Sequence, residues 1–207
     1  MKSPYFFVMI TGRIECAHFP KYVDNLYCRY ILSYGPDWTM LHGLDSGISQ
    51  IARRHDFAAD RGIVWNFPME ASFQSTNAHG WPRIAVAAYG LDGLGRDVIR
   101  GYGSITVPTA PGRYDEIIDL YRPISGNPCQ QFQNWLSGTI PEFYDTRFTT
   151  QNQGRQLVRV KGVGGNIKVI FEITTKDMKN FGYSICKKRY DDDDDHNQTI
   201  HDNFKYD

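Results

Sequence analysis

Six histidines and four cysteines are the residues of this 207-residue chain best suited to metal binding or nucleophilic catalysis. The cysteines lie far apart without a C-x-x-C pair, which argues against a zinc cluster or a redox dithiol; they are Cys16, Cys28, Cys129 and Cys186. Four histidines fall in or beside expected loops, with no cysteine or carboxylate at ligand spacing; they are His18, His42, His55 and His79. Because the sequence also lacks the nucleophile-elbow, phosphate-loop and H-E-x-x-H motifs, we expect no enzymatic activity, no metal site and no cofactor.

A run of five carboxylates, Asp191–Asp195, could bind a hard cation. Calcium requires roughly six to eight oxygens held in a defined cage. An unstructured run must lose conformational entropy to form such a cage. We therefore expect a solvated tail, with weak binding of a cation or of a basic partner as the alternative.

Two features could contact a partner or a membrane. Trp38, in the segment GPDW, is the best candidate for an exposed contact, although a place in the core fits it equally well. Arg53 and Arg54, with Arg61 nearby, form the densest basic spot outside the tail. A solvated surface is the simpler interpretation of these arginines, and contact with lipid headgroups is the alternative.

Charge and composition narrow the class of protein. The formal net charge is zero, but seven aspartates lie in the last 21 residues, so the rest of the chain is slightly basic. Nucleic-acid binding needs a concentrated basic face, which this chain lacks. No run approaches the 18 apolar residues of a spanning helix. We expect a soluble, intracellular protein with reduced thiols.

The elements that must position these residues are mainly strands. Short apolar or alternating runs, separated by Gly, Pro and Asn turns, predict an all-β, antiparallel sandwich of about eight strands. The strands are expected over 5–16, 26–34, 48–54, 62–68, 69–75, 83–90, 98–107, 111–123, 154–160 and 165–175. A loop is expected over 35–47, and one short helix over 129–138, where Trp135 shares an apolar face with its neighbours.

Several segments in this order resemble the B-nine domain family. They are YCRYILSYGPDW (27–38), GISQIA (47–52), VWNFP (64–68), FQSTNAHGWP (73–82), VIRGYGSITVPTAPGR (98–113) and ITTKDMKNFGY (173–183). Each segment is weak alone, but the ordered set is specific. The resemblance predicts one domain over 5–184, followed by a disordered acidic tail over 185–207. Because the domain begins almost at Met1, the chain resembles the small members of the family rather than the large Meckel syndrome member.

The resemblance implies a fold and a function that composition does not show. The family is a divergent relative of the C-two domain, a lipid-binding β-sandwich. Its three paralogues act together in the tectonic-like, or Meckel-syndrome, complex on the cytoplasmic side of the ciliary transition zone, at the basal body and axoneme base. There the complex supports ciliogenesis and the diffusion barrier for ciliary membrane proteins. The expected partners are the two other paralogues, membrane subunits of the complex and, as a further option, an anionic membrane surface.

Calcium binding is a common property of C-two relatives and depends on grouped loop aspartates. Here the candidates are spread singly, and no D-x-D pair places two carboxylates on one ion; they are Asp24, Asp37, Asp45, Asp92 and Asp97. We therefore expect no calcium site. The alternative to a scaffold is a calcium-independent peripheral phospholipid-binding module, for which attraction of about 1 kcal/mol per basic residue gives only weak attachment.

Overall fold

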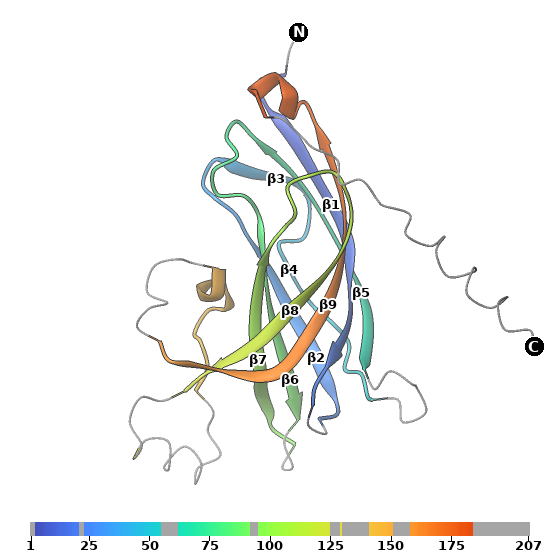
Figure 1. Cartoon of the computed structure of the whole chain (residues 1–207), viewed down its shortest axis with the longest axis vertical. Coiled ribbons are helices and arrows are strands. Elements are labelled where there is room, and N and C mark those ends of the chain that lie inside the picture. Colours follow the sequence, from blue (N-terminus) through green and yellow to red (C-terminus); the bar gives the residue numbers. More distant parts are fainter. Residues whose placement is uncertain are drawn as a thin grey trace, which may run out of the picture.

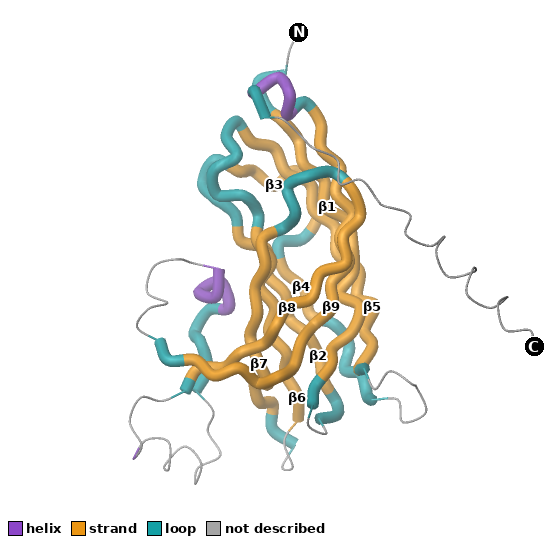
Figure 2. The backbone as a smooth tube through the Cα atoms, in the orientation of Figure 1, coloured by secondary structure: helices purple, strands orange, loops and turns teal. Residues whose placement is uncertain are grey.

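Strands make up most of the structure, a computed structural model that describes residues 3–20, 23–54, 62–91, 95–124, 129, 141–150 and 158–183 (Figure 2). The nine strands are β1 (Phe6–His18), β2 (Leu26–Ser33), β3 (Trp38–Gly43), β4 (Ser46–Ile48), β5 (Ile63–Ser75), β6 (Arg83–Leu91), β7 (Asp97–Thr106), β8 (Gly112–Pro123) and β9 (Val160–Lys176). Two short 3-10 helices, η1 (Thr146–Thr150) and η3 (Met178–Phe181), complete the described elements. The prediction of an all-β, antiparallel fold is confirmed, with nine strands in place of about eight.

The nine strands form one hydrogen-bonded series in the order β3-β5-β1-β9-β8-β7-β6-β2-β4 (Figure 1). The series curls into two layers, which we call the first layer (β3, β5, β1, β9 and β8) and the second layer (β7, β6, β2 and β4). The layers are joined at β8 and β7 by a single residue pair, Tyr102 with Tyr121. On the opposite side the series ends in β3 and β4, which follow each other in the chain with only Leu44 and Asp45 between them. Both free ends of the sheet therefore lie on one side of the sandwich.

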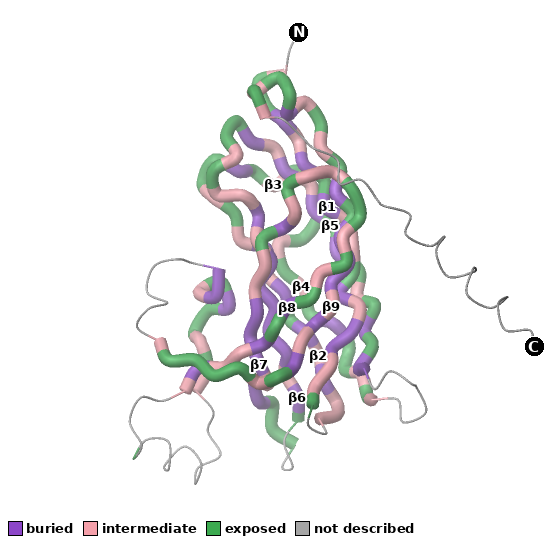
Figure 3. The backbone as a smooth tube through the Cα atoms, in the orientation of Figure 1, coloured by how far each residue is buried: buried purple, intermediate pink, exposed green. Residues whose placement is uncertain are grey.

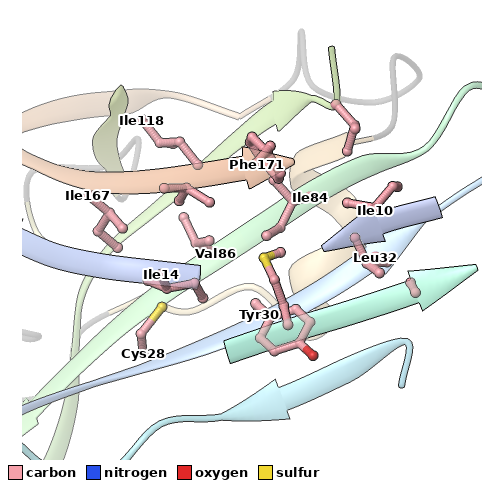
Figure 4. Close-up of a cluster of buried hydrophobic side chains, with 14 of the residues drawn as sticks. Ile10, Ile14, Cys28, Tyr30, Leu32, Ile84, Val86, Ile118, Ile167 and Phe171 are labelled. Atoms are coloured by element: carbon pink, nitrogen blue, oxygen red, sulfur yellow. The ribbon is translucent and has the colours of Figure 1, made fainter. Parts of the chain in front are cut away.

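The core between the layers is aliphatic and aromatic. Side chains of β1, β2, β6, β8 and β9 converge in it, and several are wholly buried (Figure 4). A hydrogen bond also crosses the layers, because the indole Nε1 of Trp65 on β5 donates to the carbonyl of Leu26 on β2 at 2.9 Å. Buried and exposed residues alternate along most strands, as the two-residue period of a pleated sheet requires (Figure 3).

The long strand β5 shows how local sequence sets the register. Two strands were expected over 62–68 and 69–75, but the structure has one. The register opposite β1 shifts by one residue near Asn66, whose φ of 46° is one that asparagine tolerates. The bulge lets one strand continue through Pro68. The alternating sequence of 69–75 predicts Met69, Ala71 and Phe73 on one side of the strand, and this is confirmed because all three are buried in the core.

Residues 35–47 were expected to form a loop, and this is wrong. They contain β3 and the start of β4, the two strands at the ends of the sheet order. The strand expected over 48–54 is also wrong in extent, because β4 ends at Ile48 and only an isolated bridge at Ala52 follows. The helix expected over 129–138 lies outside the described residues apart from Cys129, which is helical. Most of the strand expected over 154–160 and the whole tail after Tyr183 also lie outside them.

Candidate functional site

The open side of the sandwich carries a segment that we call the edge ribbon, residues 38–52. It comprises β3, the Leu44–Asp45 link, β4 and the stretch to Ala52. One end is fixed by Trp38, which is 3% exposed, and whose indole Nε1 donates to the carbonyl of His79 at 2.8 Å. The other end is fixed by paired backbone hydrogen bonds between Ala52 and Leu26 at 2.8 and 3.0 Å. The ribbon is therefore held at both ends by the core.

Between these anchors the edge ribbon exposes aliphatic side chains to solvent. Leu41 is 52% exposed, Leu44 70%, Ile48 52% and Ile51 56%. These four are a third of the twelve large hydrophobic side chains exposed in the described part of the chain. Single exposed hydrophobic residues are ordinary, but a cluster of them on one side of a protein marks an interaction surface.

The same ribbon contains the terminal strands of the sheet. Natural proteins protect such edges with lysines, prolines or bulges, because an unpaired strand is a template for another strand. Here the protection is slight. A bulge falls at Leu41, between the pairs that Met40 and His42 make with β5. From Trp38 to Ala52 the chain has no lysine, arginine or proline.

Asp45 is the single carboxylate of the edge ribbon. Its Oδ2 lies 3.1 Å from a terminal guanidinium nitrogen of Arg147, and both side chains are nearly half exposed. A surface ion pair of this kind contributes at most about 1 kcal/mol. The ribbon is thus close to uncharged and mainly apolar.

A depression of about 260 Å³ opens on the outer face of the first layer, beside β3. Its apolar lining is Phe7, Val8, Met9, Leu41 and Phe73, and its polar lining is Ser72, Thr174, Thr175 and Lys176. Leu41 belongs to both the depression and the ribbon. The depression itself lies over β5, β1 and β9, on the inner side of β3 within the sheet.

A group of ion pairs lies elsewhere on this outer face. The Nζ of Lys168 lies 2.7 Å from Oε2 of Glu15 and 3.4 Å from Oδ2 of Asp115. The hydrogen bond between Lys168 and Glu15 lowers the pKa of Glu15 and raises the pKa of Lys168. Because Arg13 also lies 3.3 Å from Glu15, each carboxylate has a cationic partner, which suits a solvated sheet surface rather than a catalytic pair.

The outer face of the second layer contains a tyrosine cluster. Tyr27 and Tyr89 stack at 5.3 Å, and the Tyr27 hydroxyl donates to Oδ2 of Asp97 at 3.1 Å. Burial, followed by that hydrogen bond, raises the pKa of Tyr27 to about 12. Burial also raises the pKa of Tyr89 and of Tyr102. These hydroxyls stay protonated at neutral pH, so the cluster does not supply a base.

The thiol of Cys28 is equally unsuited to chemistry. It is wholly buried, and burial raises its pKa to about 12. Because the thiolate is the reactive species, this cysteine is inert at neutral pH. Across the described ranges, no three His, Cys, Asp or Glu side chains gather closely enough to hold a metal ion. Nor does any helix of those ranges have the length and apolar character to cross a bilayer.

The expectation that Trp38 lies exposed on a loop is wrong. It is the first residue of β3, and its ring makes edge-to-face contacts with Phe6 at 5.5 Å and with Trp81 at 5.0 Å. The alternative of a core position holds, because the rings of Phe6, Phe73 and Trp81 pack against the indole. A surface contact through Trp38 is therefore not proposed.

The two arginines singled out from the sequence are neighbours in the chain but make different contacts. Arg53 is exposed, and its Nε donates to Oδ1 of Asn25 at 2.9 Å. Arg54 is half-buried and donates to the carbonyl of Phe19 at 3.1 Å, while its backbone N–H donates to Asp24 at 2.8 Å. Arg54 therefore connects its own segment to the loop between β1 and β2, which contains Phe19 and Asp24. Arg53 is the more exposed of the two arginines.

The loop aspartates do not come together. Asp24 accepts the N–H of Arg54, Asp45 pairs with Arg147, and Asp97 accepts the hydroxyl of Tyr27. Asp37 lies in the turn directly before β3, and Asp92 lies outside the described residues, as does Arg61.

Sequence reasoning missed the four exposed residues of the edge ribbon. A signal was present, since an expected loop over 35–47 that contains Leu41 and Leu44 but no lysine or arginine is unusually apolar. Exposure at a sheet edge, however, depends on which strands pair, and this pairing joins residues far apart in the chain.

Comparison with known proteins yields a consistent set of relatives. Residues 8–174 match the family model B9-C2, described as "Ciliary basal body-associated, B9 protein". The chain is 44% identical over 178 residues to mouse B9 domain-containing protein 1, and this alignment covers 86% of each chain. It is 28% identical over 163 residues to human B9 domain-containing protein 2, covering 77% of this chain and 88% of the relative. Among solved structures, a C2 domain of plant extended synaptotagmin 1 aligns with a TM-score of 0.43 at 8% identity, covering 82% of this chain and 95% of that domain.

Proposed function

This chain belongs to the family of ciliary basal body-associated B9 proteins, and on that premise we propose that it is a non-enzymatic scaffold subunit of the tectonic-like, or Meckel-syndrome, complex. It acts at the ciliary transition zone, on the cytoplasmic side of the membrane. There it contributes to ciliogenesis and to the diffusion barrier that gates ciliary membrane proteins. Its partners are the two other B9 paralogues and, through them, membrane subunits of the complex.

The observation that carries the proposal is the edge ribbon. Leu41, Leu44, Ile48 and Ile51 form an exposed aliphatic surface at the free ends of the sheet. A scaffold subunit needs a permanent docking surface of this kind, whereas an enzyme needs a cleft with reactive groups whose pKa values are shifted toward neutrality. The tyrosines and the cysteine with strongly raised pKa values are shifted away from neutrality instead.

Co-purification with the two paralogues tests the scaffold role. The full chain is co-expressed with each paralogue and with both, and the complexes are sized by gel filtration with light scattering. We expect a stable hetero-oligomer that contains this chain. A chain that stays monomeric in the presence of both paralogues would contradict the proposal.

A second measurement tests the location in cells. The tagged chain, expressed in ciliated cells that lack the endogenous protein, should concentrate between the basal body and the axoneme and restore cilia. A uniform cytoplasmic distribution together with full restoration of the barrier would contradict the scaffold role, because a scaffold must be present where it assembles.

A second candidate function is calcium-independent binding to anionic phospholipid. It is favoured by Arg53, which is exposed at the loop end of the sandwich beside Asn25. Flotation with phosphatidylserine vesicles at low salt is the sensitive test, because electrostatic attraction is then least screened. We expect at most weak binding, reduced by Arg53→Gln. Lack of flotation of the parent chain at low salt would exclude this function.

A further inference from the structure

The two free strands of the edge ribbon are not equivalent. β3 spans six residues and pairs with β5 along one side only, while β4 spans three residues and pairs with β2 at three positions. In the described part of the chain, β3 stands at one end of the strand order. Among the described residues, no other strand pairs with its outer side. Six residues are a common strand length, whereas three offer little hydrogen bonding.

The chemistry of the ribbon restricts what can bind there. An added strand would meet Leu41 and Leu44 next to β3, and both are more than half exposed. It would meet no lysine or arginine between Trp38 and Ala52, and one carboxylate, Asp45, that Arg147 already neutralises. A lipid headgroup or an acidic segment finds no cation on this ribbon. An uncharged strand with aliphatic side chains complements it.

Leu41 also lines the depression, which lies over β5, β1 and β9 rather than on the outer side of β3. Its volume of about 260 Å³ and its lining by Phe7, Met9 and Leu41 suit an apolar group. The bulge at Leu41 bends the strand at this point, and bulges commonly re-aim side chains next to binding sites. In strand addition at a sheet edge, main-chain hydrogen bonds supply affinity and side-chain contacts supply specificity; here the exposed Leu41 and Leu44 are available for those contacts.

We infer that β3 receives an extended, uncharged, aliphatic strand from another protein chain, which adds to the first layer of the sheet and packs its side chains against Leu41 and Leu44. This inference rests on the proposed scaffold function, and it identifies the surface that meets a paralogous B9 domain. Ile48 and Ile51 are further exposed aliphatic residues of the edge ribbon.

The test compares matched substitutions in the full chain. The edge variant is Leu41→Lys with Leu44→Lys, since lysine is the residue that natural edges use against strand addition. The control is Ile117→Lys, because Ile117 is 63% exposed on β8, at the other end of the first layer. Thermal melting of each variant first confirms that the fold is intact.

Affinity for B9 domain-containing protein 2 from the same organism, and for the third paralogue, is then measured by biolayer interferometry. We expect the edge variant to raise Kd by on the order of tenfold or more for one of them, as loss of a central apolar contact does. The control should leave Kd within about twofold. An unchanged Kd for the edge variant, with the parent complex intact, would overturn the inference while the scaffold function stands.

Hydrogen exchange distinguishes strand addition from side-chain packing alone. Amides in 38–43 should exchange at least several-fold more slowly in the complex than in the free chain, because an added strand pairs with the outer side of β3. Unchanged exchange in 38–43 would overturn strand addition even if affinity falls. A homodimer of this chain that the edge variant dissociates, with hetero-complexes unaffected, would make the occupant a second copy and overturn the inference. If neither paralogue binds the parent chain, the proposed function and the inference fail together.

Discussion

Two apolar surfaces of this molecule differ in whether the chain itself covers them. On the outer face of the second layer, Ala87, Ile99 and Tyr102 are wholly buried, because residues 141–150, which we call the cap segment, lie over them. On the edge ribbon, Leu44 remains 70% exposed. The chain thus covers one outward apolar surface with its own residues and leaves the other open.

Specific hydrogen bonds hold the cap segment in place. Ser104 Oγ donates to the carbonyl of Thr149 at 2.9 Å, and Arg83 donates to that of Thr150 at 2.8 Å. The N–H of Phe143 donates to the hydroxyl of Tyr102 at 3.1 Å, and their rings lie 4.9 Å apart. The edge ribbon is held by its two ends and by backbone pairing with β5 and β2, but four of its aliphatic side chains stay exposed. The chain covers one apolar surface with its own residues and leaves the other exposed. We therefore assign a binding role to the edge ribbon alone.

The largest expected effect is on the capped surface. Tyr102→Ala removes a fully buried ring and leaves the N–H of Phe143 without its acceptor. Replacement of a buried aromatic residue by alanine typically costs about 3–5 kcal/mol. Urea unfolding followed by fluorescence should show this loss of unfolding free energy. The matched control is Tyr144→Ala, because Tyr144 lies in the same segment but is fully exposed, and it should change stability by less than about 0.5 kcal/mol. Equal effects of the two substitutions would remove the contrast between covered and open surfaces.

A second expected effect is alkaline sensitivity of the capped surface. The pKa of Tyr27 is raised to about 12 in the folded state, against about 10 in the unfolded chain. The stability associated with this shift is fully present below pH 10 and is lost as pH rises through about 12. The raised pKa values of Tyr89 and Tyr102 act in the same direction.

Urea titrations between pH 8 and pH 11.5 test this sensitivity. The unfolding free energy of the parent should fall above pH 10, and Tyr27→Phe should make the fall less steep. An identical slope in the variant would mean that the environment of Tyr27 is no different in the folded and unfolded states. Because the edge ribbon has no tyrosine, Leu44→Lys should leave this slope unchanged.

The third expected effect concerns one bond of the cap segment. Ser104→Ala removes the hydrogen bond to Thr149, and the net loss for such a bond is about 1 kcal/mol. The decrease should appear in the same urea experiment and should be accompanied by faster hydrogen exchange within 141–150. Ser46→Ala is a suitable control, because Ser46 is exposed and its hydroxyl reaches only the neighbouring Asp45. A loss in the control as large as that in Ser104→Ala would contradict a specific role for the cap bond.

How far the sequence predicts the structure differs between the same two regions. The strand positions of β1, β2, β6, β7, β8 and β9 follow from local apolar runs and alternation, and the family follows from ordered segments. The inward phase of Met69, Ala71 and Phe73 is also a local property. These features require only the geometry of a single strand.

The candidate site could not be predicted in the same way. β3 pairs with β5, so Leu41 and Leu44 border a strand that lies more than twenty residues further along the chain. Whether a strand is central or terminal depends on the whole order of the sheet, which a local pattern does not contain. Trp38 illustrates the same limit, because its burial requires Phe6, Trp81 and the carbonyl of His79 to converge. The cap segment was not predicted, since 141–150 has no strand-like or helical period.

The smallest expected effect is on the stability of the open surface, and it is the one that sharpens the comparison most. Leu44→Lys replaces an exposed side chain that contributes little buried area, so the unfolding free energy should change by less than about 0.5 kcal/mol. If the ribbon were part of the core in solution, the same substitution would cost several times more, as loss of a buried leucine does. The measurement is urea unfolding of the free chain at low concentration, with Leu120→Lys as the buried counterpart, since Leu120 is 2% exposed. A near-zero effect at Leu44 beside a large one at Leu120 would establish that the exposed leucine is unnecessary for folding. An aliphatic residue that folding does not need, at an edge without a lysine or arginine, is then best explained by what binds there.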